Sequence, residues 1–129
     1  MKKYLASLAI AVVVTPSFAS ETDGEVLYQQ LCSACHVAAP PATVAPPVFA
    51  MVDHVKKEFP DQDGFVNRVV SWVDNPQADQ ALMAGAVDKF GLMPKLGYSS
   101  DQVKIIAEYL YEGEFTKPSG HGSGEQGNH

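Results

Sequence analysis

The chain has 129 residues, a length that fits a single domain, and 46% of its residues are hydrophobic. Its formal charge of −6 at pH 7 argues against partners that need a basic surface, which are nucleic acids and anionic membranes.

The first nineteen residues form a separate segment with the order of a secretory signal peptide. Lys2 and Lys3 give a basic start, residues 5–14 form an apolar run, and Ser17-Phe18-Ala19 supplies small residues before a cleavage point. The run is short for a bilayer span, and the alternative interpretation is an uncleaved anchor. Cleavage after residue 19 removes two of the nine Lys/Arg and none of the fifteen Asp/Glu, which leaves a formal charge of −8. We therefore expect a periplasmic protein without stable membrane insertion, whose acidic surface could attract a basic partner.

Apolar residues then recur with helical spacing in five segments. Residues 22–31 predict a first helix capped by Thr22 or Asp23. Residues 38–47 hold four prolines and predict an extended loop. Further helices are expected over residues 48–59, from a cap at Asp61 or Asp63 to Asn75, over residues 77–90, and from Ser99 or Ser100 to residue 113.

The remaining segments carry no periodic pattern. Residues 91–97 predict a loop bounded by two glycines, and residues 116–129 predict a flexible Gly/Ser/His tail. Because no segment alternates in the manner of a strand, the fold class is all-α, with one domain over residues 20–115.

Cys32, Cys35 and His36 follow directly after the first predicted helix. Positions i, i+3 and i+4 lie on one face of a helical turn, so both thiols and the imidazole face the same side. Two thiols can add to the vinyl groups of one haem while the adjacent imidazole reaches its iron, and C-x-x-C-H is the attachment signature of haem c.

Three other readings of the same residues compete with haem attachment. A thioredoxin-like redox pair would stand beside a βαβ pattern, which this sequence lacks. A zinc site would need a second pair of ligands, and the chain has only two cysteines. A plain disulfide between Cys32 and Cys35 is the structural alternative.

An iron held by His36 requires a sixth ligand or has an open site. The candidates are Met51, Met83, Met93, His54, His121 and His129. Met93 is favoured because it lies in the glycine-bounded loop before Pro94, where a thioether can be held rigidly and raise the reduction potential. Met83 is the second choice and is expected to pack along a helix, since methionine fills gaps well. Met51 and His54 are expected to be packing or surface residues, and the two tail histidines to be solvated.

With these motifs the mature chain resembles the class I c-type cytochromes, which are small monohaem electron carriers. Gly24 and Tyr28 match the positions at which the first helix of that family crosses the last one, here near Tyr109. The resemblance also implies that the carbonyl of Pro46 accepts a hydrogen bond from His36, and that Trp72 or Arg68 contacts a haem propionate. The alternative for the last pair is that Trp72 is core and Arg68 is surface.

The fold implied by the resemblance is a cytochrome c-like set of helices wrapped around one covalently attached haem. The proline-rich run and the helices around Trp72 and Ala81 depart from the mitochondrial carrier and leave the redox partner open. Lys89 and Lys95 flank the methionine loop and could mark a docking surface. The apolar side chains expected around the haem are Val26, Leu27, Leu31, Val69, Trp72, Leu92 and Ile106.

The function predicted is electron transfer by one haem c with His36 and Met93 as iron ligands, without enzymatic activity. Donor and acceptor would be redox partner proteins. Two alternatives remain at this stage. One is a haem sensor or peroxidase-like enzyme with a labile sixth site, and the other is an accessory haem subunit of a larger redox complex.

Overall fold

A computed structural model describes residues 21–119, and within this part of the chain all regular secondary structure is helical, which confirms the all-α class. It contains α1 (Glu21–Leu31), α2 (Val48–Glu58), α3 (Gln62–Asp74), a 3-10 turn η1 (Ala78–Gln80), α4 (Ala84–Phe90) and α5 (Ser100–Glu112). The expected signal peptide, His121 and His129 lie outside the described residues. Residues 116–119 contain no helix or strand and are exposed.

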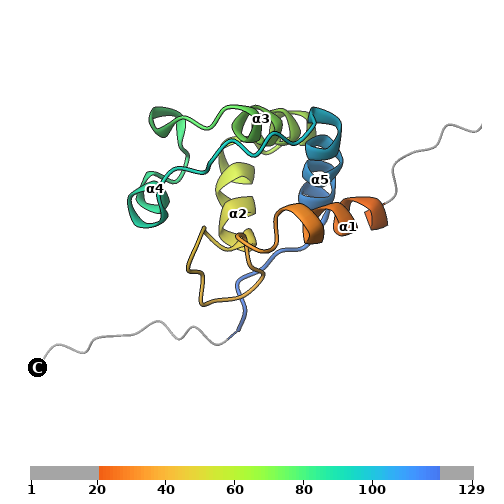
Figure 1. The fold of residues 1–129 in the computed structure, drawn as a ribbon. Helices are drawn as coiled ribbons and strands as arrows, with labels where there is room; N and C mark the ends of the chain where they lie inside the picture. The colour runs from red at the N-terminus through yellow and green to blue at the C-terminus, as the bar shows by residue number, and fades with distance from the viewer. Residues whose placement is uncertain (1–20, 120–129) are drawn as a thin grey trace, which may run out of the picture.

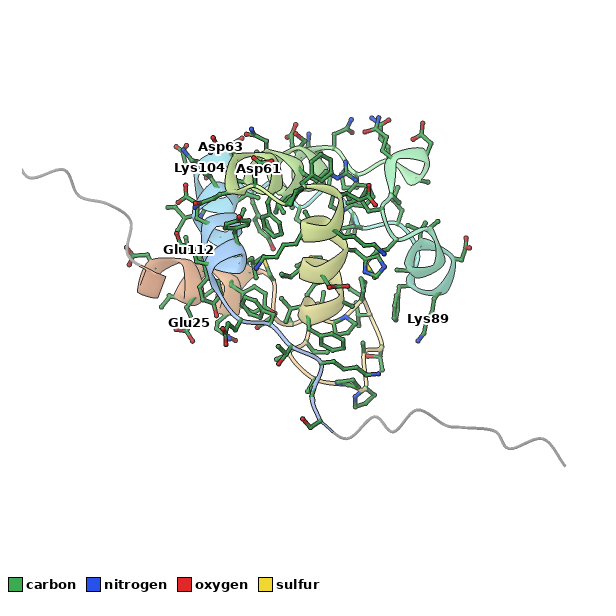
Figure 2. All side chains as sticks on the ribbon, turned by 180° about the vertical axis from the view of Figure 1, so that it is seen from behind. Glu25, Asp61, Asp63, Lys89, Lys104 and Glu112 are labelled. Atoms are coloured by element: carbon green, nitrogen blue, oxygen red, sulfur yellow. The ribbon has the colours of Figure 1, made fainter. Side chains whose placement is uncertain are left out.

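The C-terminal helix α5 is the centre of the packing. It contacts both α1 and α3, and α2 contacts α3 and α5 (Figure 1). The largest fully buried side chains, Val48, Phe65 and Leu110, come from α2, α3 and α5 and meet in one apolar core. Charged side chains such as Glu25 and Lys104 point away from that core (Figure 2). α4 lies apart at the opposite side of the molecule from α1 (Figure 1).

Gly24 allows α1 to lie directly on α5. A Cβ atom at this position would overlap the Cβ of Tyr109 and would lie 2.9 Å from the carbonyl oxygen of Ile105. One turn later, the buried Tyr28 packs its ring at 6.0 Å from that of Tyr109. The close crossing expected from Gly24, Tyr28 and Tyr109 is therefore confirmed.

The helix ends follow local capping chemistry. Asp61 caps α3 by accepting a 2.8 Å hydrogen bond from the Gly64 amide. Ser99 and Gln102 form a reciprocal capping box at the start of α5. These contacts involve residues three positions apart, and for that reason the expected starts of both helices are correct.

The expectation of one helix over residues 77–90 is wrong. The segment divides into η1 and α4, with residues 81–83 outside any helix. The guanidinium of Arg68 donates to the Gln80 carbonyl at the end of η1, and Leu82 packs against the core. Both contacts are made by residues distant in sequence, and they favour an extended connection over a continuous helix.

Candidate functional site

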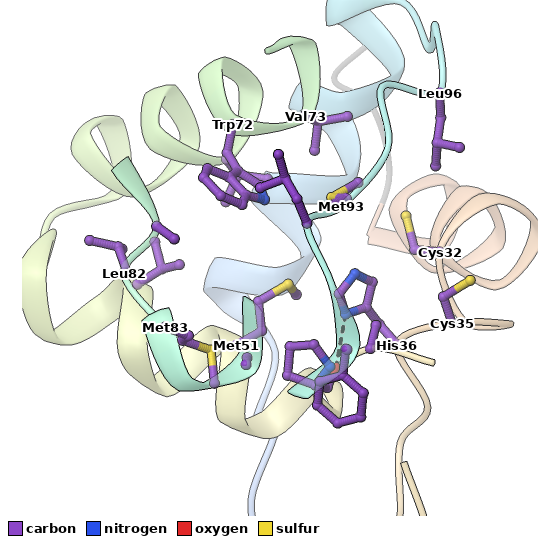
Figure 3. Close-up of a pocket in the computed structure, with 18 of the residues that line it drawn as sticks. Cys32, Cys35, His36, Met51, Trp72, Val73, Leu82, Met83, Met93 and Leu96 are labelled. Carbon is purple, nitrogen blue, oxygen red and sulfur yellow. Dashed lines mark hydrogen bonds between the residues drawn. The ribbon is translucent and has the colours of Figure 1, made fainter. Parts of the chain in front are cut away.

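A cavity of about 330 Å³ lies between the end of α1, helices α2 to α5 and the loop before α5. Its wall is predominantly apolar. In Figure 3, Cys32, Cys35 and His36 reach it from one side, and Trp72, Met51 and Met83 reach it from the other. The four residues predicted to hold a haem, Cys32, Cys35, His36 and Met93, all line this one cavity.

The cysteines stand on a tight turn that continues α1. The Tyr28 carbonyl accepts hydrogen bonds from the amides of Cys32 at 2.9 Å and Ser33 at 3.0 Å, and the Cys32 carbonyl accepts one from His36 at 2.9 Å. Both cysteines are free thiols, Cys32 half-buried and Cys35 exposed. Two unpaired sulfurs and one imidazole are thus presented along a single edge of the cavity.

His36 is held by a hydrogen bond that fixes its tautomer. Its Nδ1 lies 2.9 Å from the Pro46 carbonyl oxygen, so the hydrogen bond expected at this proline is confirmed. A carbonyl oxygen only accepts hydrogen bonds, and Nδ1 must therefore carry the hydrogen. In the neutral imidazole the lone pair then belongs to Nε2, the nitrogen through which histidine binds a metal.

Burial controls the protonation of the residues around this turn. Burial of His36 removes its hydration and lowers the pKa of its imidazole, and this effect outweighs the hydrogen bond to Pro46, which raises the pKa. The imidazole is therefore kept neutral. Burial and the neighbouring Cys35 raise the pKa of Cys32 to about 11. Burial, followed by the neighbouring Cys32 and Tyr109, raises the pKa of Tyr28 to about 12. At neutral pH the His36 imidazole is therefore neutral, and the Cys32 thiol and the Tyr28 hydroxyl keep their protons.

The loop of Met93 begins after α4 and ends at Ser99. It contains no helix or strand, and the glycines at positions 91 and 97 have φ angles of 85° and 73°, which other residues rarely adopt. Met93 is half-buried and reaches the cavity, as expected of a loop methionine. The hydroxyl of Tyr98 donates a 3.1 Å hydrogen bond to the Leu31 carbonyl at the end of α1.

Met83, Met51 and His54 also line the cavity. The expectation that Met83 packs along a helix is wrong, because Met83 is the N-cap residue of α4. Met51 packs against the core, and His54 is exposed with its Nδ1 at 2.8 Å from the Ala50 carbonyl. Three thioethers thus face one cavity from three different elements.

Trp72 and Arg68 form part of the same wall. The guanidinium of Arg68 lies 5.2 Å from the centre of the Trp72 ring. Both residues are half-buried, so neither the simple core nor the simple surface alternative describes them. Lys89 lies 4.8 Å from the Phe90 ring, and Lys95 pairs with Asp74 at 3.3 Å on the surface.

Two of the apolar residues expected around the cavity are not part of its wall. Val26 is 47% exposed, and Leu27 packs against the core instead. The other five, Leu31, Val69, Trp72, Leu92 and Ile106, do line it.

Two tyrosine hydroxyls were not foreseen from the sequence. Tyr28 donates to the His36 carbonyl, eight residues away, and Tyr98 reaches back to Leu31. The i, i+8 spacing of Tyr28 and His36 is a signal visible in the sequence only when the turn after α1 is already known.

The described residues thus define an all-α protein with one apolar cavity edged by two thiols and an imidazole. Among residues 21–119, no three His, Cys, Asp or Glu side chains gather closely enough to hold a metal, and no helix has the length and apolarity to cross a membrane.

The chain belongs to the same family as a protein of Aquifex aeolicus (strain VF5) that is described as an uncharacterized protein. The two are 30% identical over an alignment of 135 positions, gaps included, which covers 86% of this chain and 87% of the relative. No protein-family model and no solved structure matches the chain significantly.

Proposed function

We propose that this chain is a periplasmic monohaem c-type cytochrome that carries one electron between redox partner proteins. The observation that carries this function is the arrangement of His36. Its Nδ1 donates a hydrogen bond to the Pro46 carbonyl, so that Nε2 carries the free lone pair. The His36 ring lines an apolar cavity together with Cys32, Cys35 and Met93.

Cys32 and Cys35 would attach the haem. Each thiol would form one carbon–sulfur bond to a vinyl group of the haem, and its hydrogen would pass to the other vinyl carbon. Both cysteines are free and line the same cavity edge, three residues apart, which suits two bonds to one planar group. Attachment needs reduced thiols outside the cytoplasm, in keeping with the signal peptide expected over residues 1–19.

His36 and Met93 would be the two protein ligands of the iron, which would supply one-electron redox chemistry when the haem is bound. The bond to Pro46 orients the imidazole and increases its basicity. The Met93 thioether is a soft ligand that favours the reduced metal. Two protein ligands would leave no open position for a substrate, and this would distinguish a carrier from a sensor or a peroxidase-like enzyme.

The apolar wall would keep water from the haem. Leu31, Val69 and Ile106 line it from three different helices, and burial among such side chains disfavours the additional charge of the oxidised centre. Arg68 and Trp72 are the wall residues with hydrogen-bond donors on α3, and we propose them as partners of a propionate.

The mass of the protein exported by its own signal sequence tests haem attachment. We expect the bare mature chain plus one haem, and we expect the Cys32→Ala/Cys35→Ala variant to have the mass of the bare chain. If the wild-type mass equals that of the bare chain, the function proposed is wrong.

Carbon monoxide tests the sixth ligand. The reduced wild-type protein should not bind it readily, and Met93→Ala should, because the variant has an open coordination position. Met83→Ala is the matched control, since Met83 lines the same cavity. If carbon monoxide binds to Met83→Ala and not to Met93→Ala, the ligand is Met83.

A further inference from the structure

The loop that carries Met93 is connected to other elements through few side chains. Within residues 21–119, two polar side-chain contacts link loop residues 92–98 to another element. One is the ion pair of Lys95 with Asp74 at 3.3 Å, and the other is the 3.1 Å hydrogen bond of Tyr98 with Leu31.

The hydrogen bond is the more stabilising of the two contacts. The side chains of Lys95 and Asp74 are 61% and 67% exposed, and ion pairs with that exposure contribute little. Tyr98 is half-buried and lines the cavity. Its acceptor is the carbonyl of the last residue of α1, which belongs to the group of carbonyls that the helix itself leaves without a partner. Loss of the hydroxyl would therefore leave this carbonyl without that bond.

The bond also joins the two segments that hold the proposed ligands. Leu31 directly precedes Cys32, and Tyr98 follows Met93 by five residues. We propose that Tyr98 is a positioning residue, whose hydroxyl holds the Met93 loop against the turn of Cys32 and His36 and so makes Met93 difficult to displace from the iron. This role depends on the haem and the Met93 ligation proposed above.

Tyr98→Phe isolates the effect, because it keeps the ring in the cavity wall and removes only the hydroxyl. Exogenous imidazole competes with Met93 for the oxidised iron, so its apparent affinity measures how firmly Met93 is held. A net intramolecular hydrogen bond of ordinary strength predicts an affinity about fivefold higher in the variant, equivalent to about 1 kcal/mol.

Tyr111→Phe is the matched control for the experiment. The Tyr111 hydroxyl donates a 2.9 Å hydrogen bond to the Pro60 carbonyl, and the residue does not line the cavity. Imidazole titrations of the haem-loaded wild type and both variants, with melting temperatures recorded alongside, should show the increase for Tyr98→Phe only. An unchanged affinity in Tyr98→Phe, or an equal increase in Tyr111→Phe, overturns the role of Tyr98.

A second background separates positioning from general loosening. In Met93→Ala the ligand is already absent, so adding Tyr98→Phe should leave imidazole affinity unchanged. A further fivefold increase in the double variant would mean that Tyr98 acts independently of Met93. Failure of the proposed function is distinguishable, since it shows as a wild-type protein without bound haem or as a Met93→Ala variant that binds carbon monoxide no better than the wild type. Failure of this inference alone shows as normal haem content, carbon monoxide binding by Met93→Ala and unaltered imidazole affinity in Tyr98→Phe.

Discussion

Replacing Gly24 with alanine should destabilise the protein, although alanine is the better helix former. The substitution gains about 1 kcal/mol of helix propensity. Against this, the new methyl group would overlap the Tyr109 Cβ and lie 2.9 Å from the Ile105 carbonyl oxygen. Neither atom can move by a side-chain rotation, so α1 must shift on α5. Overpacking of this kind destabilises the folded state by up to about 3 kcal/mol. After the gain in helix propensity is subtracted, the free energy of unfolding should fall by about 2 kcal/mol.

The matched control for this prediction is Gly85→Ala in α4. A Cβ at Gly85 would meet no atom within 4 Å, so only the propensity gain remains, up to about 1 kcal/mol. Thermal unfolding followed by circular dichroism should give opposite signs for the two variants. For a domain of this size, we expect Gly24→Ala to lower the melting temperature by roughly 8–16 °C. A Gly24→Ala variant as stable as the wild type would refute the close crossing of α1 and α5.

Two further predictions concern the C-terminal segment and Tyr28. Ending the chain after Phe115 should leave haem content and melting temperature nearly unchanged, since residues 116–119 are exposed. Phe115→Ala, in contrast, should lower the free energy of unfolding by about 2 kcal/mol, because the Phe115 ring packs with its centre 5.5 Å from that of Tyr109. A large loss on truncation would show that the tail packs. Because the pKa of Tyr28 is raised to about 12 from an ordinary value of 10.0, the unfolded chain loses this proton first, and stability should fall as the pH rises from 10 towards 12. Urea titrations across that range should show a weaker decline for Tyr28→Phe, and an identical decline would contradict the shift.

The features that could be predicted from the sequence are those that depend on neighbouring residues. Asp61 and Ser99 begin α3 and α5 because each accepts an amide hydrogen bond from three positions ahead. The turn of Cys32 and His36 is local in the same sense. For such features, the residues that form the sequence pattern are the same residues that make the contact.

The features that could not be predicted depend on contacts between distant segments. Helical periodicity marks Val26 as apolar without showing which neighbour it faces. Since Gly24 lies against α5, a residue two positions later is turned by about 200° from that contact, and Val26 is accordingly exposed. The break after η1 depends on Arg68, twelve residues before the carbonyl that it binds.

The two segments that bear the proposed iron ligands are held very differently. The turn of His36 is fixed by the Tyr28 carbonyl and hydroxyl and by the Pro46 carbonyl, all from half-buried or buried positions. Within residues 21–119, the Met93 loop is linked to other elements by the hydrogen bond of the Tyr98 hydroxyl and by an exposed ion pair. An electron carrier and an open-site haem protein would need the same firm attachment on the histidine side and would differ only on the methionine side. Under the proposed ligation, the difference between these two functions therefore depends on the short loop between Gly91 and Ser99.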